Sequence, residues 1–445
     1  MRNHWSSQLG FLLAAVGSAV GLGNIWKFPY ITGMNGGGAF VIVYLIAIVI
    51  CGLPLLIAEL LIGRETQKDI VGSFKSLSKN PLWSNLGWLN FAASFIILSY
   101  YGTVAGWTLD YLLKSVTASY IHLPAEEITG LFGQLVGDAY TQLLYFTIFM
   151  ILTVLVVLNG VKKGLERWNK ILMPSLFVIL VIMFVYAMTT DGAAKGIRFM
   201  FYPDFSRLSV DGVLEAIGHS FFTLSLAMGI MVTYGSYMDQ KESIFPMASR
   251  VAILDTVVAL VAGLALFPIV FTVGLEPAAG PGLIFKTLPQ VFAVIPFGHQ
   301  LSLLFFVLLS FAALSSMISI FEVVVAYLID EKGIGRTKAS LIMGVAVYIA
   351  GIPVALSYNV LSDFTIIGMP ILDGLDNIAS NYMLPIGGML TSVYVGYALK
   401  KEIARQQIVD SDKLVKVFNV WFFLIRFVTP VTIFIVFLNK IGLFG

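Results

Sequence analysis

Long apolar stretches separated by short polar loops recur along the whole chain. They lie at about 9–30, 38–62, 86–114, 142–159, 168–189, 212–237, 247–275, 298–328, 338–357, 370–398 and 417–438. A helix needs about 20 apolar residues to cross a bilayer core of about 30 Å. The pattern therefore predicts an all-α integral membrane protein, a single transmembrane domain over residues 1–445 with eleven spanning helices. The stretches at 86–114, 247–275 and 298–328 exceed the bilayer, so we expect tilted or projecting helices there.

Two of these stretches are interrupted by glycines and polar side chains. The first contains GSAVGLGN (17–24) and the sixth contains HSFFTLSLAMG (219–229). Close helix packing is one explanation, because Gly and Ser let helices approach. However, each interruption falls in the first helix of a five-helix block, which is typical of a transporter site built from inverted repeats. We predict repeats at 9–189 and 212–398 with broken helices 1 and 6, and an additional helix 11 at 417–438.

Composition and charge agree with a membrane protein and indicate its orientation. The chain is 58% hydrophobic and 12% charged, where soluble domains carry about 25% charged residues. The net charge of +2 gives no indication of nucleic acid as a partner. With the N-terminus inside, 19 of the 27 Lys and Arg residues fall on the inner side. The positive-inside rule thus predicts a multi-pass protein of the cell membrane with a cytoplasmic N-terminus and the C-terminus outside.

Two further features of the sequence concern a cleaved signal peptide and disulfide bonds. The N-terminus MRNHWSSQLG lacks the regions of a cleaved signal peptide, so we expect the first apolar run to be a retained helix. Cys51 is the one cysteine, which excludes a disulfide within the chain and predicts a small buried core residue.

Oxygen-bearing side chains lie in and near the interrupted helices. Unwound backbone is tolerated at membrane depth only where it is buried or lines a cavity, and its free carbonyls can replace the hydration shell of Na⁺. The side chains that fit an alkali ion are Asn24, Thr223, Asp255, Ser315 and Ser316. The four histidines are scattered, so a transition-metal site is not expected.

Several motifs resemble those of the neurotransmitter:sodium symporter family. They are Trp5, GSAVGLGNIWKFPY (17–30), NGGGAF (35–40), YYGTVAGWTL (100–109), SFFTLSLAMG (220–229) and FAALSSMISI (311–320). The resemblance covers about residues 1–400 in the family's order and spacing. It implies a bacterial sodium-coupled amino-acid transporter of the eleven-helix type that works by alternating access.

The resemblance implies two sodium sites. The first would comprise the Ala19 carbonyl, the side chains of Asn24, Thr223 and Asp255, and the substrate carboxylate. The second would comprise the carbonyls of Gly17, Val20 and Ala312 and the hydroxyls of Ser315 and Ser316. Taken singly, each serine is more often a helix-packing residue.

The resemblance also implies an apolar substrate pocket. Its residues would be Ala19, Gly21, Leu22, Gly23, Ile97, Tyr101, Phe222, Thr223, Ser225, Met228, Ser316 and Ile320. Gly21 stands where the family's monoamine carriers have an aspartate, so the pocket lacks a fixed anion. We therefore expect hydrophobic L-amino acids, which bring their own carboxylate to Tyr101 and to the N–H groups near Leu22 and Gly23.

A third implied feature is charge compensation at the family's chloride position. Asp255 stands where chloride-dependent relatives have asparagine, while Tyr44, His219 and Thr223 complete the position. We expect Asp255 to supply the negative charge, so that chloride is not required; a structural role for Asp255 is the alternative. His219 either donates to Asp255 or is an ordinary buried donor.

Charged residues match the family's gates. Lys27 and Asp376 match the outer pair, and Arg2 and Asp330 match the inner pair. Other family members more often have Arg at the position of Lys27. Because Lys cannot form the bidentate contact that a guanidinium makes with a carboxylate, the ion pair of the outer gate should be weaker.

Four other residues are candidates for structural or gating roles. Glu59 matches an acid that supports the unwound backbone. Glu322 lies seven residues after Ser315 on the same helix face, and it either lines the inner exit or is a partner-bound structural acid. Gly164 and Pro174 either allow local unwinding that wets the second sodium site or mark a simple turn before helix 5.

These observations predict a sodium-driven importer and not an enzyme, since no nucleophile with a base is evident. An ion channel is the rival interpretation, disfavoured because the polar residues converge on a midplane pocket, and a membrane-embedded enzyme comes third. The expected partners are a small-molecule amino acid and membrane lipid, with no nucleic acid and no obligatory protein partner.

Overall fold

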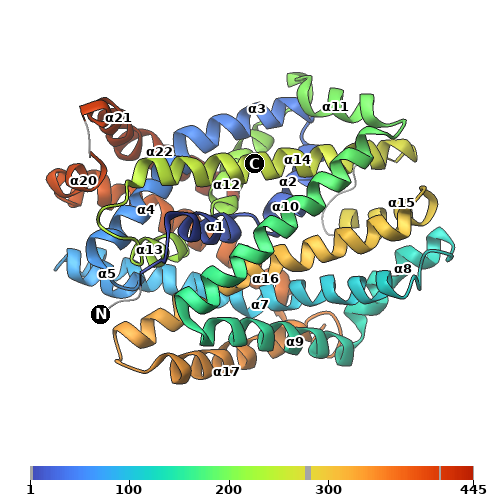
Figure 1. The fold of residues 1–445 in the computed structure, drawn as a ribbon, viewed down its shortest axis with the longest axis horizontal. Helices are drawn as coiled ribbons and strands as arrows, with labels where there is room; N and C mark the ends of the chain where they lie inside the picture. Colours follow the sequence, from blue (N-terminus) through green and yellow to red (C-terminus); the bar gives the residue numbers. More distant parts are fainter. Residues whose placement is uncertain (1–3, 276–281, 410–411, 444–445) are drawn as a thin grey trace.

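The computed structural model describes residues 4–275, 282–409 and 412–443, and these residues form a bundle of helices (Figure 1). The helices of the first half are α1 (Gln8–Ala19), η1 (Gly23–Lys27), α2 (Phe28–Met34), α3 (Gly38–Ala47), η2 (Ile48–Gly52), α4 (Leu53–Thr66), α5 (Ile70–Leu77), α6 (Pro81–Ser84), α7 (Leu86–Val116), α8 (Ala125–Gly137), α9 (Ala139–Leu158), η3 (Val161–Glu166), α10 (Arg167–Met188), α11 (Ala193–Phe201) and η4 (Phe205–Arg207).

The second half contains the remaining helices and one small hairpin. Its elements are α12 (Val210–Thr223), α13 (Ile230–Gly235), α14 (Ile244–Thr272), η5 (Leu283–Thr287), α15 (Leu288–Val294), α16 (Gly298–Asp330), α17 (Arg336–Ala355), β1 (Thr365–Ile366), β2 (Met369–Pro370), α18 (Ile371–Asn377), η6 (Ile378–Met383), α19 (Leu384–Val393), η7 (Tyr394–Ala398), α20 (Lys401–Ile408), α21 (Asp412–Phe423), η8 (Leu424–Val428) and α22 (Thr429–Lys440). The strands pair antiparallel, with Thr365 opposite Pro370 and Ile366 opposite Met369.

Each predicted span coincides with helical backbone. Eight helices of the described residues are long and apolar enough to cross a membrane, and two further pairs qualify if each bent pair is one span. The first pair, Gln8–Ala19 with Gly23–Met34, bends by 49° and is predicted helix 1. Predicted helix 6 consists of α12 and α13, which are separately too short to span. Helices 1 and 6 are therefore broken, as the sequence predicts.

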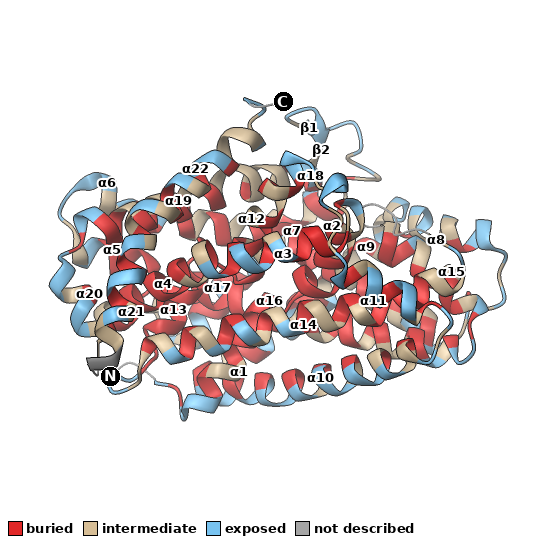
Figure 2. Ribbon diagram, turned by 90° about the horizontal axis from the view of Figure 1, so that it is seen from above, coloured by how far each residue is buried: buried red, intermediate tan, exposed pale blue. Residues whose placement is uncertain are grey.

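The central helices are buried and the peripheral ones expose apolar side chains. Helix α16 packs along α7 and is buried over most of its length (Figure 2). Helices α9, α10 and α17 instead expose large hydrophobic side chains, including Ile151, Ile171, Val185 and Ile349. A helix that exposes such residues needs an apolar surrounding, which lipid supplies.

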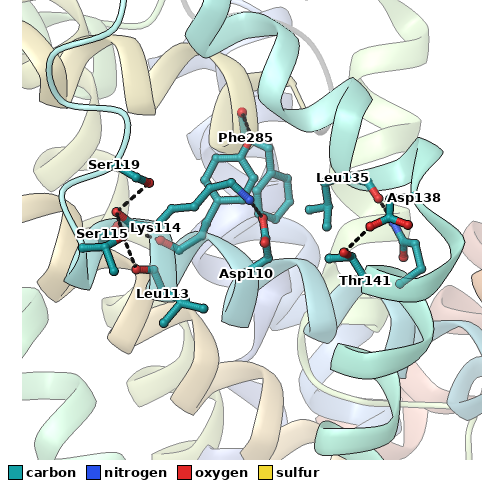
Figure 3. A network of polar contacts seen from close by, with 12 residues as sticks. Asp110, Leu113, Lys114, Ser115, Ser119, Leu135, Asp138, Thr141 and Phe285 are labelled. Atoms are coloured by element: carbon teal, nitrogen blue, oxygen red, sulfur yellow. Dashed lines mark hydrogen bonds and ion pairs between the residues drawn. The ribbon is translucent and has the colours of Figure 1, made fainter.

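Polar contacts connect the end of α7 with the neighbouring segments (Figure 3). Lys114 forms an ion pair with Asp110 one turn earlier, and the Tyr111 hydroxyl donates to the Phe285 carbonyl at 2.7 Å. Asp138 caps α9 by accepting from the Tyr140 N–H at 3.1 Å. The Tyr111 hydrogen bond ties α7, which carries two of the predicted pocket residues, to η5.

Candidate functional site

The break in helix 1 leaves backbone groups that side chains from other helices bind. Helix α1 ends at Ala19, and the next residue, Val20, is extended. The freed Ser18 carbonyl accepts from Ser225 Oγ at 2.9 Å and Ser316 Oγ at 3.3 Å. The first helix, the sixth and α16 therefore meet at one carbonyl.

The break in helix 6 has more strained backbone. Between α12 and α13, Ser225 and Ala227 adopt positive φ values of 55° and 63°, a backbone conformation that residues other than Gly rarely adopt. Glu59 Oε1 accepts from the Ala227 N–H at 2.6 Å, and the Ser94 hydroxyl donates to the Met228 carbonyl. Glu59 thus makes the kind of backbone contact that its match to the family implied.

A small cavity of about 30 Å³ lies between the two breaks. All twelve predicted pocket residues line it, together with Ser18, which the sequence reasoning did not select; the full set is Ser18, Ala19, Gly21, Leu22, Gly23, Ile97, Tyr101, Phe222, Thr223, Ser225, Met228, Ser316 and Ile320. Ser18 falls within the GSAVGLGN interruption, so its position was the available signal. Of the described residues that line the cavity, none carries a charged side chain.

Two lining residues define the polar end of this cavity. The Tyr101 hydroxyl lies near Ser316 and the Leu22 backbone, yet it forms no hydrogen bond with any described residue. A Cβ placed on Gly21 would lie 2.4 Å from Ser316 Oγ and 3.4 Å from Tyr101 Oη. A side chain at position 21 would therefore enter the cavity next to the free hydroxyl.

The side chains of the first predicted sodium site contact one another. Asn24 Nδ2 donates to Asp255 Oδ1 at 2.7 Å, and Thr223 Oγ1 lies 3.0 and 3.1 Å from the two carboxylate oxygens. Asp255 is fully buried, and no Lys or Arg of the described segments forms an ion pair with it. A buried carboxylate with neutral partners favours a cation beside it. These hard oxygen donors fit Na⁺.

The residues of the second predicted site lie on α16 and on the end of α1, which pack against each other. Ser315 Oγ donates to the Ala312 carbonyl at 3.0 Å, and Ser316 reaches the Ser18 carbonyl as described above. Gly17 and Val20 are buried at the end of α1. The α16 hydroxyls therefore lie close to the freed carbonyls of the first helix.

Asn169 on α10 is a polar residue that the sequence reasoning missed. A Cβ on Gly17 would lie 2.1 Å from Asn169 Oδ1, so the amide contacts the glycine directly. Asn169 is fully buried; its Nδ2 donates to the Leu165 carbonyl, while Oδ1 has no partner among the described residues. A single amide within the apolar fifth helix was the signal that could have indicated it.

Of the remaining residues of the chloride position, Tyr44 lies close to Asp255 and Thr223, and His219 contacts Tyr44. His219 stacks on Phe28 with ring centroids 6.1 Å apart and lies 5.6 Å from the Tyr44 ring. Neither of its ring nitrogens has a hydrogen-bond partner among the described residues, so His219 does not donate to Asp255. The ring is buried, as the alternative interpretation expects, although neither nitrogen donates to a described residue. Aromatic stacking holds the ring instead.

The predicted outer gate residues line a vestibule of about 360 Å³ next to the central cavity. Within the described part of the chain, Lys27 and Asp376 both line this vestibule and form no ion pair with each other. Lys27 Nζ lies over the Phe222 ring at 4.6 Å, and Asp376 Oδ1 accepts from the hydroxyls of Tyr100 and Ser380, each at 2.9 Å. Each charge is thus bound by a neighbour.

The N-terminal segment covers the opposite side of the cavity. Arg2 of the predicted inner pair lies outside the described residues, and Asp330 accepts from the Asp69 backbone N–H at 2.8 Å. The Trp5 indole donates to the Tyr234 carbonyl at 3.1 Å, and its ring packs on Tyr237. These contacts hold the N-terminal segment against α13 and the residues that follow it.

Glu322 is a partner-bound acid. Its two oxygens accept from both terminal nitrogens of Arg336 at 2.8 Å, and Oε1 also accepts from the Tyr237 hydroxyl at 2.6 Å. Of the two interpretations of this residue, the structure favours the structural one.

The start of predicted helix 5 is more than a simple turn. A π-helical segment, Val161–Glu166, contains Gly164 and precedes α10, within which Pro174 lies. A Cβ on Gly164 would lie 2.2 Å from the Val156 carbonyl oxygen. Glu166 accepts from the Ser6 N–H at 2.9 Å, which ties the N-terminal segment to this irregular turn.

Together, two broken helices, an uncharged cavity between them and buried oxygen donors beside it define a secondary transporter of the discontinuous-helix class. Comparison with known proteins identifies the family within this class. The profile described as the sodium:neurotransmitter symporter family matches residues 2–130 and 134–444. The chain belongs to this family, which confirms the resemblance seen in the sequence and shows that the protein is a transporter and not an enzyme.

Individual relatives agree with this assignment. The sodium-dependent transporter YhdH of Bacillus subtilis (strain 168) is 39% identical over 442 residues, covering 99% of this chain and 98% of the relative. A sodium-dependent transporter of Haemophilus influenzae is 33% identical, with the same coverage. The crystal structure of MhsT in complex with L-phenylalanine matches with a TM-score of 0.90 and 45% identity, covering 99% of this chain and 100% of that one. The chain is thus a membrane protein that carries out sodium-coupled transport.

Proposed function

We propose that this protein imports hydrophobic L-amino acids together with two sodium ions and without chloride. The observation that carries the proposal is the cavity between the two helix breaks, whose described lining residues are apolar or neutral. A substrate that enters such a site must bring charges that the backbone can compensate. An amino-acid zwitterion with an apolar side chain meets this condition, and the solved relative holds L-phenylalanine.

The two ends of the zwitterion have matching partners around the cavity. The backbone N–H groups at Leu22 and Gly23 begin the second half of helix 1, where the helix dipole favours an anion. The free Tyr101 hydroxyl can donate to the same carboxylate. The ammonium group would lie near the carbonyls at the end of α12, which ends at Thr223 and carries the negative end of its dipole.

Sodium coupling follows from the first proposed sodium site. An ion held by Asn24, Thr223 and Asp255 would also contact the substrate carboxylate, because Ala19 and Thr223 line the substrate cavity. Each ligand then improves the site of the other, and this linkage is reciprocal. The second ion, between the end of α1 and Ser315 and Ser316, would stabilise the packing of α1 against α16. Asp255 provides the negative charge for which other family members use chloride.

The proposed direction is inward, with the N-terminus in the cytoplasm and the C-terminus outside the cell membrane. The excess of Lys and Arg on the N-terminal side supports it. The vestibule of about 360 Å³ and the covering N-terminal segment lie on opposite sides of the cavity, which suits a transporter loaded from outside. Repeats at 9–189 and 212–398 would rock against each other around this site, with Lys27 and Asp376 at the outer gate and Arg2 and Asp330 at the inner one.

A competition panel tests the substrate class. Purified protein binds radiolabelled L-leucine in saturating Na⁺, and each of the twenty amino acids and dopamine is added in excess. Leucine, phenylalanine and tryptophan should displace the label, and glutamate, lysine and dopamine should not. Strong displacement by dopamine, which lacks a carboxylate, would contradict the proposed bond between carboxylate and sodium.

A further inference from the structure

A run of three glycines brings two distant segments together beside α3. Gly36 and Gly37 belong to the connection between α2 and α3, and Gly38 begins α3. Gly37 forms an isolated antiparallel bridge with Pro203. A Cβ on Gly36 would lie 2.8 Å from Arg207 Cβ, and one on Gly38 would lie 2.9 Å from the Tyr202 backbone. The glycines therefore allow the α11 segment to pack directly on this connection (Figure 1).

This contact creates a cleft with an excess of positive charge. The cleft has a volume of about 280 Å³ and is lined by Gly36, Lys195, Arg198, Phe199, Tyr202, Asp204 and Arg207. Asp204 Oδ2 lies 3.4 Å from Arg207 Nε, so one of the three cations has an anionic partner. Lys195 lies 4.5 Å from the Phe271 ring centroid and Arg198 lies 5.3 Å from that of Tyr202. Aromatic rings orient these two cations without neutralising them.

The cleft opens on a surface that suits lipid tails. Gly196 and Met200 of α11 are buried against α14, whereas Ile197, Phe201 and Phe205 are 42%, 54% and 58% exposed. Directly after the glycines, α3 exposes Ile42, Leu45 and Ile46, and η2 continues this face with Val49. Since a helix rises 1.5 Å per residue, Ile42 lies only about 6 Å along the axis from Gly38. The apolar outer face of α3 thus begins at the edge of the cleft.

We propose that this cleft binds the phosphodiester of an anionic phospholipid. Aromatic residues and amphipathic helices are typical of the level of the headgroups, where a phosphate would meet Lys195 and Arg198, the two cations that Asp204 does not pair with. The planar guanidinium suits bidentate contacts with phosphate oxygens. A zwitterionic lipid would bring its own ammonium group to a cleft in which two cations already lack an anionic partner among the described residues. The acyl chains would cover Phe201, Phe205 and the exposed face of α3, which a free phosphate ion leaves bare.

The bound lipid would hold a segment close to the transport site. The α11 segment joins α10 to α12, and α12 ends at the helix 6 break. A lipid anchored between α11 and the start of α3 would fix this connection to the membrane. The proposal does not depend on which substrate the central cavity accepts.

Native mass spectrometry of the purified full chain tests the proposal. Dioleoyl phosphatidylglycerol and dioleoyl phosphatidylcholine are titrated separately into wild type and the double variant Lys195→Gln/Arg198→Gln. The control Lys332→Gln/Lys338→Gln removes two exposed cations far along the chain. Wild type and control should bind one phosphatidylglycerol more tightly than phosphatidylcholine. The double variant should lose about fivefold in affinity per cation removed. The charge-conserving variant Lys195→Arg/Arg198→Lys should retain most of the preference.

Two further measurements test whether the double variant is folded and whether the apolar rim contributes to lipid binding. Retained sodium-driven uptake by the double variant shows that it is folded. The variant Phe201→Ser/Phe205→Ser keeps the cations and removes the apolar rim, and it should also bind phosphatidylglycerol less tightly. Equal binding of the two lipids by wild type, or unchanged binding by the double variant, overturns the proposal. Displacement of the lipid by inorganic phosphate at equal concentration would show that the ligand is free phosphate, and would overturn it too.

Discussion

Replacing Asp255 by Asn removes a buried charge and keeps the shape of the side chain. The carboxylate accepts from Asn24 at 2.7 Å and from Thr223 at 3.0 and 3.1 Å. The amide oxygen of the variant can still accept from Asn24, so the packing should survive. A sodium ion bound by the oxygens of Asn24 and Thr223 would lie within about 4 Å of the carboxylate.

The size of the effect follows from this separation. Two unit charges about 4 Å apart attract each other by about 4 kcal/mol at an effective dielectric constant of about 20. That energy corresponds to roughly a thousandfold in affinity, and the desolvation of the carboxylate reduces the difference. We therefore expect the Na⁺ concentration for half-maximal uptake to rise at least tenfold in Asp255→Asn.

The assay is sodium-dependent uptake of L-leucine into proteoliposomes, in chloride and in gluconate. Wild type should work equally in both, because the compensating charge belongs to the protein. Asp255→Asn should recover part of its activity in chloride. The recovery should be larger when Ala259, one helical turn after Asp255 on α14, is also changed to Ser, because the added hydroxyl can donate to the anion. The control Asp363→Asn removes an exposed carboxylate and should behave as wild type. A wild type that stops in gluconate, or an Asp255→Asn variant with unchanged Na⁺ dependence in gluconate, would refute the reasoning.

The other predictions concern the remaining oxygens and the pocket. Asn24→Ala and Ser316→Ala should each raise the Na⁺ concentration for half-maximal substrate binding by about tenfold, because each removes an oxygen ligand from a sodium ion. Unchanged Na⁺ titrations of substrate binding would remove both residues from the proposed sodium sites. Gly21→Asp should abolish leucine uptake, because its carboxylate would enter the cavity beside the substrate carboxylate; retained affinity in a binding assay would contradict the proposed substrate orientation. Asn169→Leu should slow the release of ²²Na⁺ and leave equilibrium leucine affinity unchanged, because its unpaired oxygen contacts Gly17; an unaltered release rate would assign Asn169 to packing alone.

The spans and the breaks were predictable from the sequence for physical reasons. Backbone groups must be paired inside lipid, so every crossing is a long apolar helix, and its length is visible in the residues. The glycines and polar side chains at 17–24 and 219–229 interrupt the regular apolar helix, and the helices break there. The boundaries were less accurate. Predicted helix 5 starts at Val161 and not at 168, because its first turn is π-helical and polar.

The pocket residues were predictable from motifs, and their detailed partners were not. Lys27 binds over Phe222 and not to Asp376, and that choice depends on side-chain geometry that two motifs cannot specify. Arg336, the partner of Glu322, lies fourteen residues later on the next helix, so only the fold brings them together. Asn169 was missed because one amide in an apolar helix has no periodic pattern.

The most direct test of sodium-coupled import is flux into proteoliposomes that contain the purified protein. Radiolabelled L-leucine is supplied outside, and Na⁺ is present outside only, on both sides, or replaced by choline. We predict saturable accumulation above the outside concentration with the inward Na⁺ gradient, equilibration without accumulation when Na⁺ is equal on both sides, and no uptake in choline. Accumulation that is the same in Na⁺ and in choline, or a sodium conductance that needs no amino acid, would contradict the account.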